Sequence, residues 1–268
     1  NISQSYFLKV MNNYDIILIS PNRFININNI SDNSKIKVIA TVSTGINHLD
    51  KNIFLKKKIK LIYLNDKDFL NNIYATAEHS IFLLLSLVKN SLQNFKNTNS
   101  TNKFKKSVNT EIANKNFGIL GYGRVGKQVA HIVSSMKGII HVYDKYSNRK
   151  NKKYKFYKNI NLFIKSIEFL MIHIDNRDEN FHFLDNQTLK NSNNLSIINT
   201  SRGEVLDTKC LINMMKKNKI TGYASDVFEN EYLNKFDDKI YDAYMNGYNI
   251  IITPHNAGIT EESIKKTD

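Results

Sequence analysis

Three residues in the second half of the sequence have side chains suited to chemistry on a small organic acid. Arg202, Glu231 and His255 each follow a predicted strand, in the segments INTSRGEVLD, SDVFENE and ITPHNAG. Arginine offers a permanent charge and a planar fork that fits a carboxylate, while histidine carries protons in either direction near neutral pH. A carboxylate beside the imidazole fixes its tautomer and favours its protonated form. Together the three predict the binding of a 2-keto or 2-hydroxy acid and proton transfer at its C2 oxygen.

Each of these residues also has an ordinary structural interpretation when it is taken alone. Arg202 fits a helix N-terminus, Glu231 a solvated loop and His255 a turn. Their order behind successive strands favours the functional interpretation. The other histidines have no such company in the sequence: His48, His79, His131, His141, His173 and His182. His131 and His141 flank one predicted helix–strand unit and are predicted to be packing or surface residues. No spacing typical of metal ligands is present, so no metal site is predicted.

A glycine-rich segment, NFGILGYGRVGKQVAHIV, has GxGxxG spacing between an apolar strand and an amphipathic helix. Such glycines allow a tight turn, close approach of a pyrophosphate to the backbone, and close packing of helix on strand. Amides at the helix N-terminus then bind the anion. The predicted cofactor contacts in this loop are Gly121, Tyr122, Gly123, Arg124, Val125 and Gly126. Because no GxxxxGK[ST] motif occurs, nucleotide hydrolysis on a phosphate loop is not predicted.

An acidic residue ends the next predicted strand. Asp144 follows Gly126 by 18 residues (144 − 126), close to the ~20 expected for an acid that binds the hydroxyls of an adenosine ribose. A carboxylate at this place repels the 2′-phosphate of NADP, so NAD is the predicted cofactor. Lys145 and Arg149 lie close by and leave the strictness of that preference open.

The elements that must position these residues alternate between short apolar runs and longer amphipathic stretches. This rhythm predicts an α/β fold with parallel sheets, whose strands end at the edge where ligands bind. Residues 75–90 predict a buried helix, and the polar residues 93–109 a surface connection with a domain boundary near residue 95. The predicted strands are residues 16–20, 37–42, 60–64, 116–120, 139–143, 169–174, 196–199, 222–225 and 249–252.

Composition limits the class of protein. A length of 268 residues predicts two modest domains or one large one, and 41% hydrophobic with 23% charged residues is ordinary for a globular chain. The net charge of +14 comes mostly from scattered lysines. Lysine-rich residues 56–60 and 148–155 lack the aromatics and glycines of nucleic-acid modules, so solvated faces are favoured and nucleic-acid binding stays an alternative.

The single cysteine, Cys210, excludes an internal disulfide and favours a reducing compartment, so we expect a cytoplasmic protein. No apolar run reaches the ~18 residues that span a bilayer, and no signal-peptide pattern opens the sequence, so no membrane partner is expected. The sequence starts at Asn1 and stops at Asp268 within a helical pattern. Truncation at both ends is therefore expected.

Over almost its whole length the sequence resembles the D-isomer-specific 2-hydroxyacid dehydrogenases, the family of phosphoglycerate, glycerate and D-lactate dehydrogenases. The resemblance implies two doubly wound parallel-sheet domains, with a Rossmann NAD-binding domain (residues 95–258) inserted into a smaller flavodoxin-like substrate domain (residues 1–94, with 259–268 returning to it). It also implies a homodimer. The motifs that carry it follow the family's order: KVIATVSTGINHLD, ATAEHSIFLLLSLVKN, GILGYGRVGKQVA, INTSRGEVLD, ITGYASDVFENE and IITPHNAG.

The resemblance implies residue roles as well. The family's arginine, glutamate and histidine fall on Arg202, Glu231 and His255. Backbone amides around Val42 and Ser43 are implied to bind the substrate carboxylate. Further cofactor contacts are implied at Thr44, Ile174, Ser201 and Asp226.

Two departures from the family pattern bear on specificity. Asp175 stands where the family often has proline, and Ser20 and Pro21 stand where phosphoglycerate members carry an arginine, which disfavours phosphoglycerate. The predicted function is NAD-dependent, reversible reduction of a small 2-keto acid to a D-2-hydroxy acid. The alternative is an NAD-sensing binding protein similar to the C-terminal-binding transcriptional corepressors, which keep the same three residues; turnover distinguishes the two.

Overall fold

The protein is described by a computed structural model over residues 2–20, 23–46, 48–100, 108–146, 152–229, 231 and 238–267. The chain divides into two compact units, which are Asn1–Asn72 with Glu261–Asp268, and Ile73–Thr260. This division falls 22 residues before the predicted boundary (95 − 73). The reason is that the helix α4, Ala75–Val88, packs its buried leucines into the core of the second unit.

The first unit holds a small parallel sheet. Its strands pair in the order β1-β2-β3, and alternate residues of β1 and β2 are buried. Ile17, Ile39 and Ile53 belong to its core. The bounds are β1 Ile16–Ile19, β2 Val38–Thr41, β3 Lys60–Ile62, α1 Gln4–Val10, η1 Met11–Asn13, η2 Ile27–Asn29, α2 Lys51–Lys56, α3 Lys67–Asn71 and α11 Glu261–Thr267.

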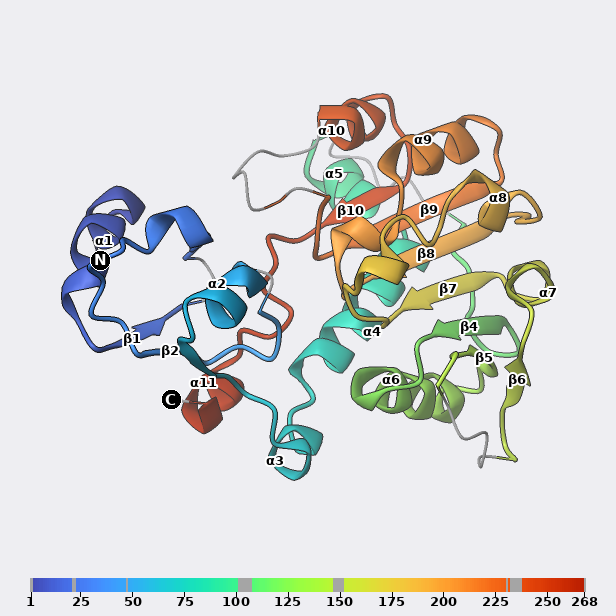
Figure 1. Cartoon of the computed structure of the whole chain (residues 1–268). Helices are drawn as coiled ribbons and strands as arrows, with labels where there is room; N and C mark the ends of the chain where they lie inside the picture. The colour runs from blue at the N-terminus through green and yellow to red at the C-terminus, as the bar shows by residue number, and fades with distance from the viewer. Residues whose placement is uncertain are drawn as a thin grey trace. The chain divides into compact units, whose positions relative to one another are not determined.

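The second unit holds a larger sheet whose strands are all parallel (Figure 1). Within the described residues its order is β10-β9-β8-β7-β4-β5-β6. From β4 the chain adds β5 and β6 on one side, and from β7 it adds β8, β9 and β10 on the other. The order of the strands therefore reverses between β4 and β7, which is the switch point where such sheets bind ligands. The bounds are β4 Asn116–Leu120, β5 Ile139–Tyr143, β6 Lys155–Tyr157, β7 Phe169–Ile172, β8 Leu195–Asn199, β9 Ile220–Ser225 and β10 Ile250–Ile252.

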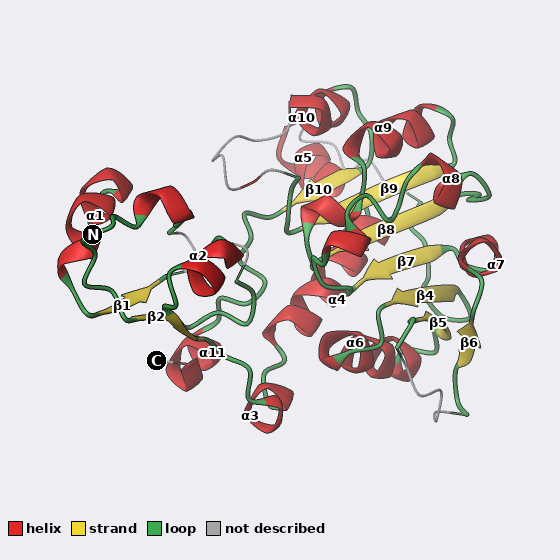
Figure 2. Cartoon of the chain, viewed as in Figure 1, coloured by secondary structure: helices red, strands yellow, loops and turns green. Residues whose placement is uncertain are grey.

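Helices cover both faces of the larger sheet, as Figure 2 shows. Leu170 and Ile172 of β7 face one core and Phe169 and Met171 face the other, so this central strand is apolar on both sides. The remaining bounds are α5 Ser91–Ser100, α6 Arg124–Ser135, α7 Ile160–Lys165, η3 Asp178–Asn180, α8 Asn186–Leu189, η4 Gly203–Val205, α9 Thr208–Lys216 and α10 Asp238–Met245. The predicted doubly wound, parallel α/β class is confirmed.

The structure departs from the sequence-based prediction at two local elements. The strand β6 was not predicted, because it is a three-residue edge strand without an apolar run. The polar stretch over residues 93–109 was predicted to be a connection, yet its first part continues α5. Elsewhere the predicted strands match the observed ones to within two residues at each end.

Two surface-related predictions are tested only in part. Among the described residues, no helix is both long and apolar enough to cross a membrane. Half of the basic stretch over residues 148–155, namely residues 148–151, lies outside the described residues. In the other stretch, Lys57 bonds the exposed carboxylate of Asp32 at 2.8 Å.

Gly203 lies where two segments of the second unit meet. A Cβ atom at this position would lie 1.9 Å from the backbone carbon of Phe228 and 2.2 Å from the amide nitrogen of Glu229. Because these contacts are with backbone, no side-chain rotation relieves them. Glycine is therefore required for η4 to pack against the segment that follows β9.

We expect Gly203→Ala to lower the free energy of unfolding by about 2 kcal/mol or more, since overpacking here displaces backbone. Urea unfolding followed by circular dichroism measures the effect. Gly258→Ala is the matched control, because a Cβ there meets nothing within 4 Å, and it should change stability by less than about 0.5 kcal/mol. Equal stability of the two variants would contradict the close packing.

Candidate active site

The glycine loop forms a tight turn between β4 and α6. Gly121 has φ of +93°, and its amide donates to the Tyr143 carbonyl at 2.9 Å. A Cβ on Gly126 would lie 2.0 Å from the Gly121 carbonyl oxygen, whereas a Cβ on Gly123 would meet nothing within 4 Å. No capping side chain accepts from the first turn of α6, so its amides are available to an anion.

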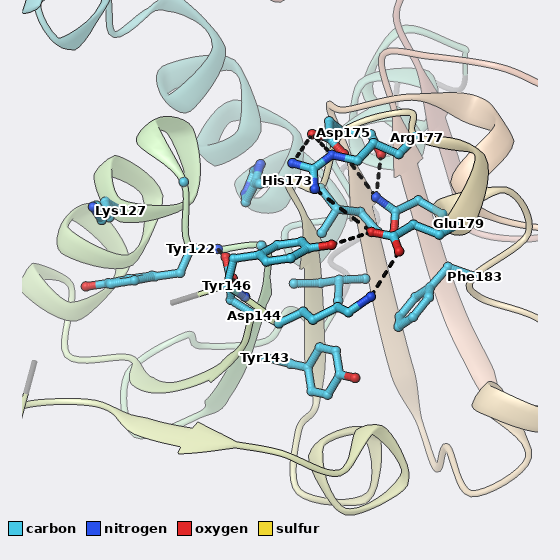
Figure 3. A pocket seen from close by; sticks show the side chains of 16 residues that line it. Tyr122, Lys127, Tyr143, Asp144, Tyr146, His173, Asp175, Arg177, Glu179 and Phe183 are labelled. Carbon is cyan, nitrogen blue, oxygen red and sulfur yellow. Dashed lines mark hydrogen bonds and ion pairs between the residues drawn. The ribbon is translucent and has the colours of Figure 1, made fainter. Parts of the chain in front are cut away.

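A cavity of about 920 Å³ opens beside this loop, between the ends of β4, β5 and β7. Figure 3 shows Asp144 and Tyr146 on one side of it and Asp175 and Glu179 on the other. The Asp144 carboxylate accepts from the amides of Tyr122, at 2.5 Å, and Tyr146, at 2.7 Å. The volume of the cavity and its position at the switch point of the sheet suit a nucleotide.

A cluster of charged side chains lies at the outer side of the cavity. Glu179 accepts from the Tyr146 hydroxyl at 2.6 Å and the Lys145 ammonium at 2.9 Å, and Arg177 pairs with Asp175 at 2.8 Å (Figure 3). The hydrogen bonds from Tyr146 and Lys145 lower the pKa of Glu179. Tyr146, Arg177 and Glu179 were not predicted from the sequence. The only signal near them was Asp175, which stands where the family often has proline.

His173 lines the cavity from the end of β7. Both ring nitrogens are buried and have no hydrogen-bond partner among the described residues. Burial lowers the pKa of this histidine to about 3, so the ring is neutral. A buried polar group without a partner costs stability, and a bound ligand is one source of the missing partner. This orphan ring and the open glycine turn both fit a dinucleotide.

The second part of the site lies at the ends of β8, β9 and β10. The Nδ1 atom of His255 bonds Oε1 of Glu231 at 2.6 Å, and Oε2 of Glu231 accepts from the Phe228 amide at 3.3 Å. The His255 side chain is 47% exposed and that of Glu231 is 25% exposed. The imidazole is thus held through one nitrogen, with half of its surface open to a reactant.

Arg202 is half-buried beside this pair, and its guanidinium donates to the Ser201 carbonyl at 2.6 Å. Burial lowers the pKa of the Arg202 guanidinium. The carboxylates of Glu231, Glu204 and Asp175 act in the opposite direction on that pKa. Glu231 contacts His255, and its charge acts on Arg202. Arg202 and His255 follow β8 and β10, so the three predicted residues lie at the same edge of the larger sheet.

Asp226, at the end of β9, is 1% exposed and holds the turn that carries His255. It accepts from the Thr253 hydroxyl at 2.5 Å, the Asn256 amide at 3.0 Å and the Ala257 amide at 2.7 Å. Burial alone raises the pKa of Asp226. Hydrogen bonds, including one from His79, outweigh burial and hold that pKa below its usual range.

The predicted cofactor contacts divide into those that line the cavity and those that do not. Gly121, Tyr122, Gly123, Asp144 and Ile174 line it. Six others do not. Thr44 belongs to the first unit, the side chain of Arg124 donates to the Ile73 carbonyl at 2.9 Å, Val125 packs on the core, Gly126 packs under Gly121, Ser201 bonds Asn199, and Asp226 holds the His255 turn.

Val42, Ser43 and Thr44 follow β2 in the first unit, where the Ser43 hydroxyl accepts from the Gly45 amide at 3.2 Å. Arg149, which left the preference between NAD and NADP open, lies outside the described residues. Among those that are described, no group of three or more His, Cys, Asp or Glu side chains is arranged to hold a metal ion.

Two of the histidines that lack such company in the sequence belong to the network around the site. The His79 ring bonds the Thr253 hydroxyl at 2.9 Å and lies 3.4 Å from the Asp226 carboxylate. The His182 ring bonds Glu229 at 2.7 Å. These acidic partners are 147 and 47 residues away in the sequence (226 − 79 and 229 − 182) and meet the histidines only in the fold.

The fold and site together define an oxidoreductase-type dinucleotide-binding unit with an acid–imidazole pair and an arginine at the edge of its sheet. Residues 81–257, about two thirds of the chain, match the family model described as D-isomer specific 2-hydroxyacid dehydrogenase, NAD binding domain. The chain belongs to the D-isomer-specific 2-hydroxyacid dehydrogenases, which are NAD-dependent enzymes. NAD is its cofactor.

Similar proteins carry several substrate names. An aromatic 2-oxoacid reductase of Clostridium sporogenes is 29% identical over 85% of this chain and 71% of its own length. A D-lactate dehydrogenase of Treponema pallidum is 25% identical over 86% and 72%. The solved structure of D-lactate dehydrogenase from Aquifex aeolicus, complexed with NAD and lactic acid, has a TM-score of 0.79 at 23% identity over 99% of this chain and 82% of its own.

We expect Asp144→Ser to bind NADPH more tightly relative to NADH, because the carboxylate that repels a 2′-phosphate is lost. Fluorescence titration with both reduced cofactors measures the ratio of dissociation constants, which should shift by about tenfold, the effect of one nearby charge worth roughly 1.4 kcal/mol. Glu179→Gln is the control, since it removes a charge from the same cavity. An unchanged ratio in Asp144→Ser, or an equal shift in the control, would contradict the role of Asp144.

Proposed function

We propose that this protein reversibly reduces a small 2-keto acid to the D-2-hydroxy acid with NADH. The observation that carries the proposal is the 2.6 Å bond between Glu231 and a half-exposed His255, with Arg202 in electrostatic reach of the same carboxylate. This arrangement supplies a fixed cation and a proton carrier, as the reaction requires.

In the proposed mechanism, bound NADH supplies hydride to the substrate C2 atom, and NAD⁺ accepts it in the reverse direction. Arg202 binds the substrate carboxylate and polarises the C2 carbonyl. During reduction, His255 donates its Nε2 proton to the C2 oxygen, and during oxidation it takes that proton back. Glu231 keeps Nδ1 protonated, which leaves Nε2 to face the substrate.

For cofactor binding we propose that Asp144 accepts from the adenosine ribose hydroxyls while the amides of the first turn of α6 bind the pyrophosphate. The resemblance to the family assigns Ile174, Ser201 and Asp226 to the nicotinamide side, Thr44 to the cofactor, and amides around Val42 and Ser43 to the substrate carboxylate. These assignments are proposals, as are the homodimer and a cytoplasmic location.

A small, unphosphorylated substrate is proposed. Arg23, which follows Ser20 and Pro21 in the first unit, donates to the Ile2 carbonyl and lies over the Phe7 ring. These contacts occupy it within the unit. The similar proteins named above are reductases or dehydrogenases of 2-oxo and 2-hydroxy acids, which supports turnover over the NAD-sensing alternative.

A panel of 2-keto acids tests the proposed function directly. NADH oxidation at 340 nm should be seen with at least one small or aromatic 2-keto acid, and chiral chromatography of the product should give the D-hydroxy acid. NADH binding without consumption across the whole panel would favour the sensor alternative instead.

We expect His255→Ala to lower kcat by about a hundredfold or more, the usual scale for a lost acid–base group. NADH binding, measured by fluorescence titration, should change less than about twofold because the cavity beside the glycine loop does not include this side chain. His131→Ala is the control, as this histidine is exposed on α6. Unchanged turnover in His255→Ala would remove the proton-transfer assignment.

A further inference from the structure

A second acid–imidazole pair lies beside the first. The Nε2 atom of His182 is 2.7 Å from Oε1 of Glu229, two residues before Glu231. Oε2 of Glu229 accepts from the Thr208 amide at 3.4 Å. The Glu229 side chain is 17% exposed and that of His182 is 31% exposed. This carboxylate therefore connects the segment carrying Glu231 to two other segments of the second unit.

His182 is itself firmly held. Its backbone lies in the left-handed region, with φ of +49°, and its amide donates to the Glu204 carbonyl at 2.8 Å. The ring stacks on Phe181, with centroids 4.0 Å apart. Two residues later, the Leu184 amide donates to the Val205 carbonyl at 3.0 Å. The segment around His182 is thus paired to the turn that directly follows Arg202.

The same turn contacts the segment that carries Glu231. Gly203 touches the backbone of Phe228 and Glu229 so closely that no Cβ fits between them. The Phe228 amide in turn donates to the Glu231 carboxylate. Contacts at Gly203 set how near the two segments come, and the Glu229 side chain fixes their relative orientation.

An exposed ion pair would contribute little, since such pairs are worth at most about 1 kcal/mol. The pair between Glu229 and His182 differs because Glu229 is mostly buried and also accepts from a backbone amide. Removing its charge leaves His182 and the Thr208 amide with a weaker acceptor. The loss of the Glu229 charge would therefore change the position of the segment that carries Glu231, which contacts His255.

We propose that Glu229 and His182 are positioning residues, which hold the segment after β9 so that Glu231 reaches His255. The inference rests on the proposed function, in which Glu231 orients His255. Neither Glu229 nor His182 touches the substrate, and both act through Glu231.

The test is a double-mutant cycle. Glu229→Gln should lower kcat about tenfold, the scale of a misplaced catalytic group, while the dissociation constant of NADH changes less than about twofold. In a Glu231→Gln background the same substitution should lower kcat by less than about twofold, because the residue through which it acts is gone. His182→Gln should reproduce the effect of Glu229→Gln, and the two together should add little.

Glu168→Gln is the matched control for a general loss of stability. Glu168 is more exposed than Glu229, but it likewise accepts from a side-chain cation, Lys115, and from a backbone amide, that of Asn116, both at 2.9 Å. It precedes β7, at the opposite edge of the sheet. Its kcat should stay within about twofold of wild type. An unchanged kcat in Glu229→Gln, or an equal loss with and without Glu231, would overturn the inference.

Nuclear magnetic resonance separates this inference from the proposed function. The ring signals of His255, assigned with His255→Ala, should move in Glu229→Gln but not in Glu168→Gln, whether or not any keto acid is turned over. Unmoved signals would overturn the positioning role. If instead His255→Ala and Glu231→Gln leave turnover unchanged, the proposed function itself fails.

Discussion

The buried carboxylate of Asp226 is the interaction on which the proposed catalytic half of the site depends. A carboxylate with 1% of its surface exposed needs several hydrogen bonds to stay charged. It finds them in Thr253, Asn256 and Ala257, which lie on both sides of His255 in the chain. The need of Asp226 for partners therefore shapes the turn, and the left-handed backbone of His255, with φ of +52°, follows from that shape.

Strand order then explains why the site has two halves. β8, β9 and β10 are neighbours in the sheet, and they end just before Arg202, Asp226 and His255. The glycine loop and Asp144 follow β4 and β5, on the other side of the switch point. All strands are parallel, so every one of these residues lies at the same edge. A ligand that extends along these strand ends would reach from Asp144 to the pair of Glu231 and His255.

How much could be predicted from the sequence depends on how local each signal is. The glycine loop was predictable because turn, strand and helix are contiguous, and Asp144 because it ends the next strand. The partners of Glu179 and Glu229 lie 33 and 47 residues away, and their pairing depends on the path of the chain through β5 to β9. Arg124 sits inside the motif, yet its side chain turns to the Ile73 carbonyl, which no local pattern indicates.

The positive net charge of the protein bears on the binding of the proposed ligands. NADH and a keto acid are both anions, and a net charge of +14 attracts them over roughly one Debye length, about 8 Å at physiological salt. Some described lysines are paired with nearby acids, as Lys37 is with Asp15 at 2.7 Å. At the cavity the charges have separate partners: the Asp144 carboxylate accepts from two backbone amides, whereas Lys145 is held by Glu179. The net positive charge of the protein would therefore attract anions in general. In the proposed function, Asp144 at the cavity would favour NAD over NADP.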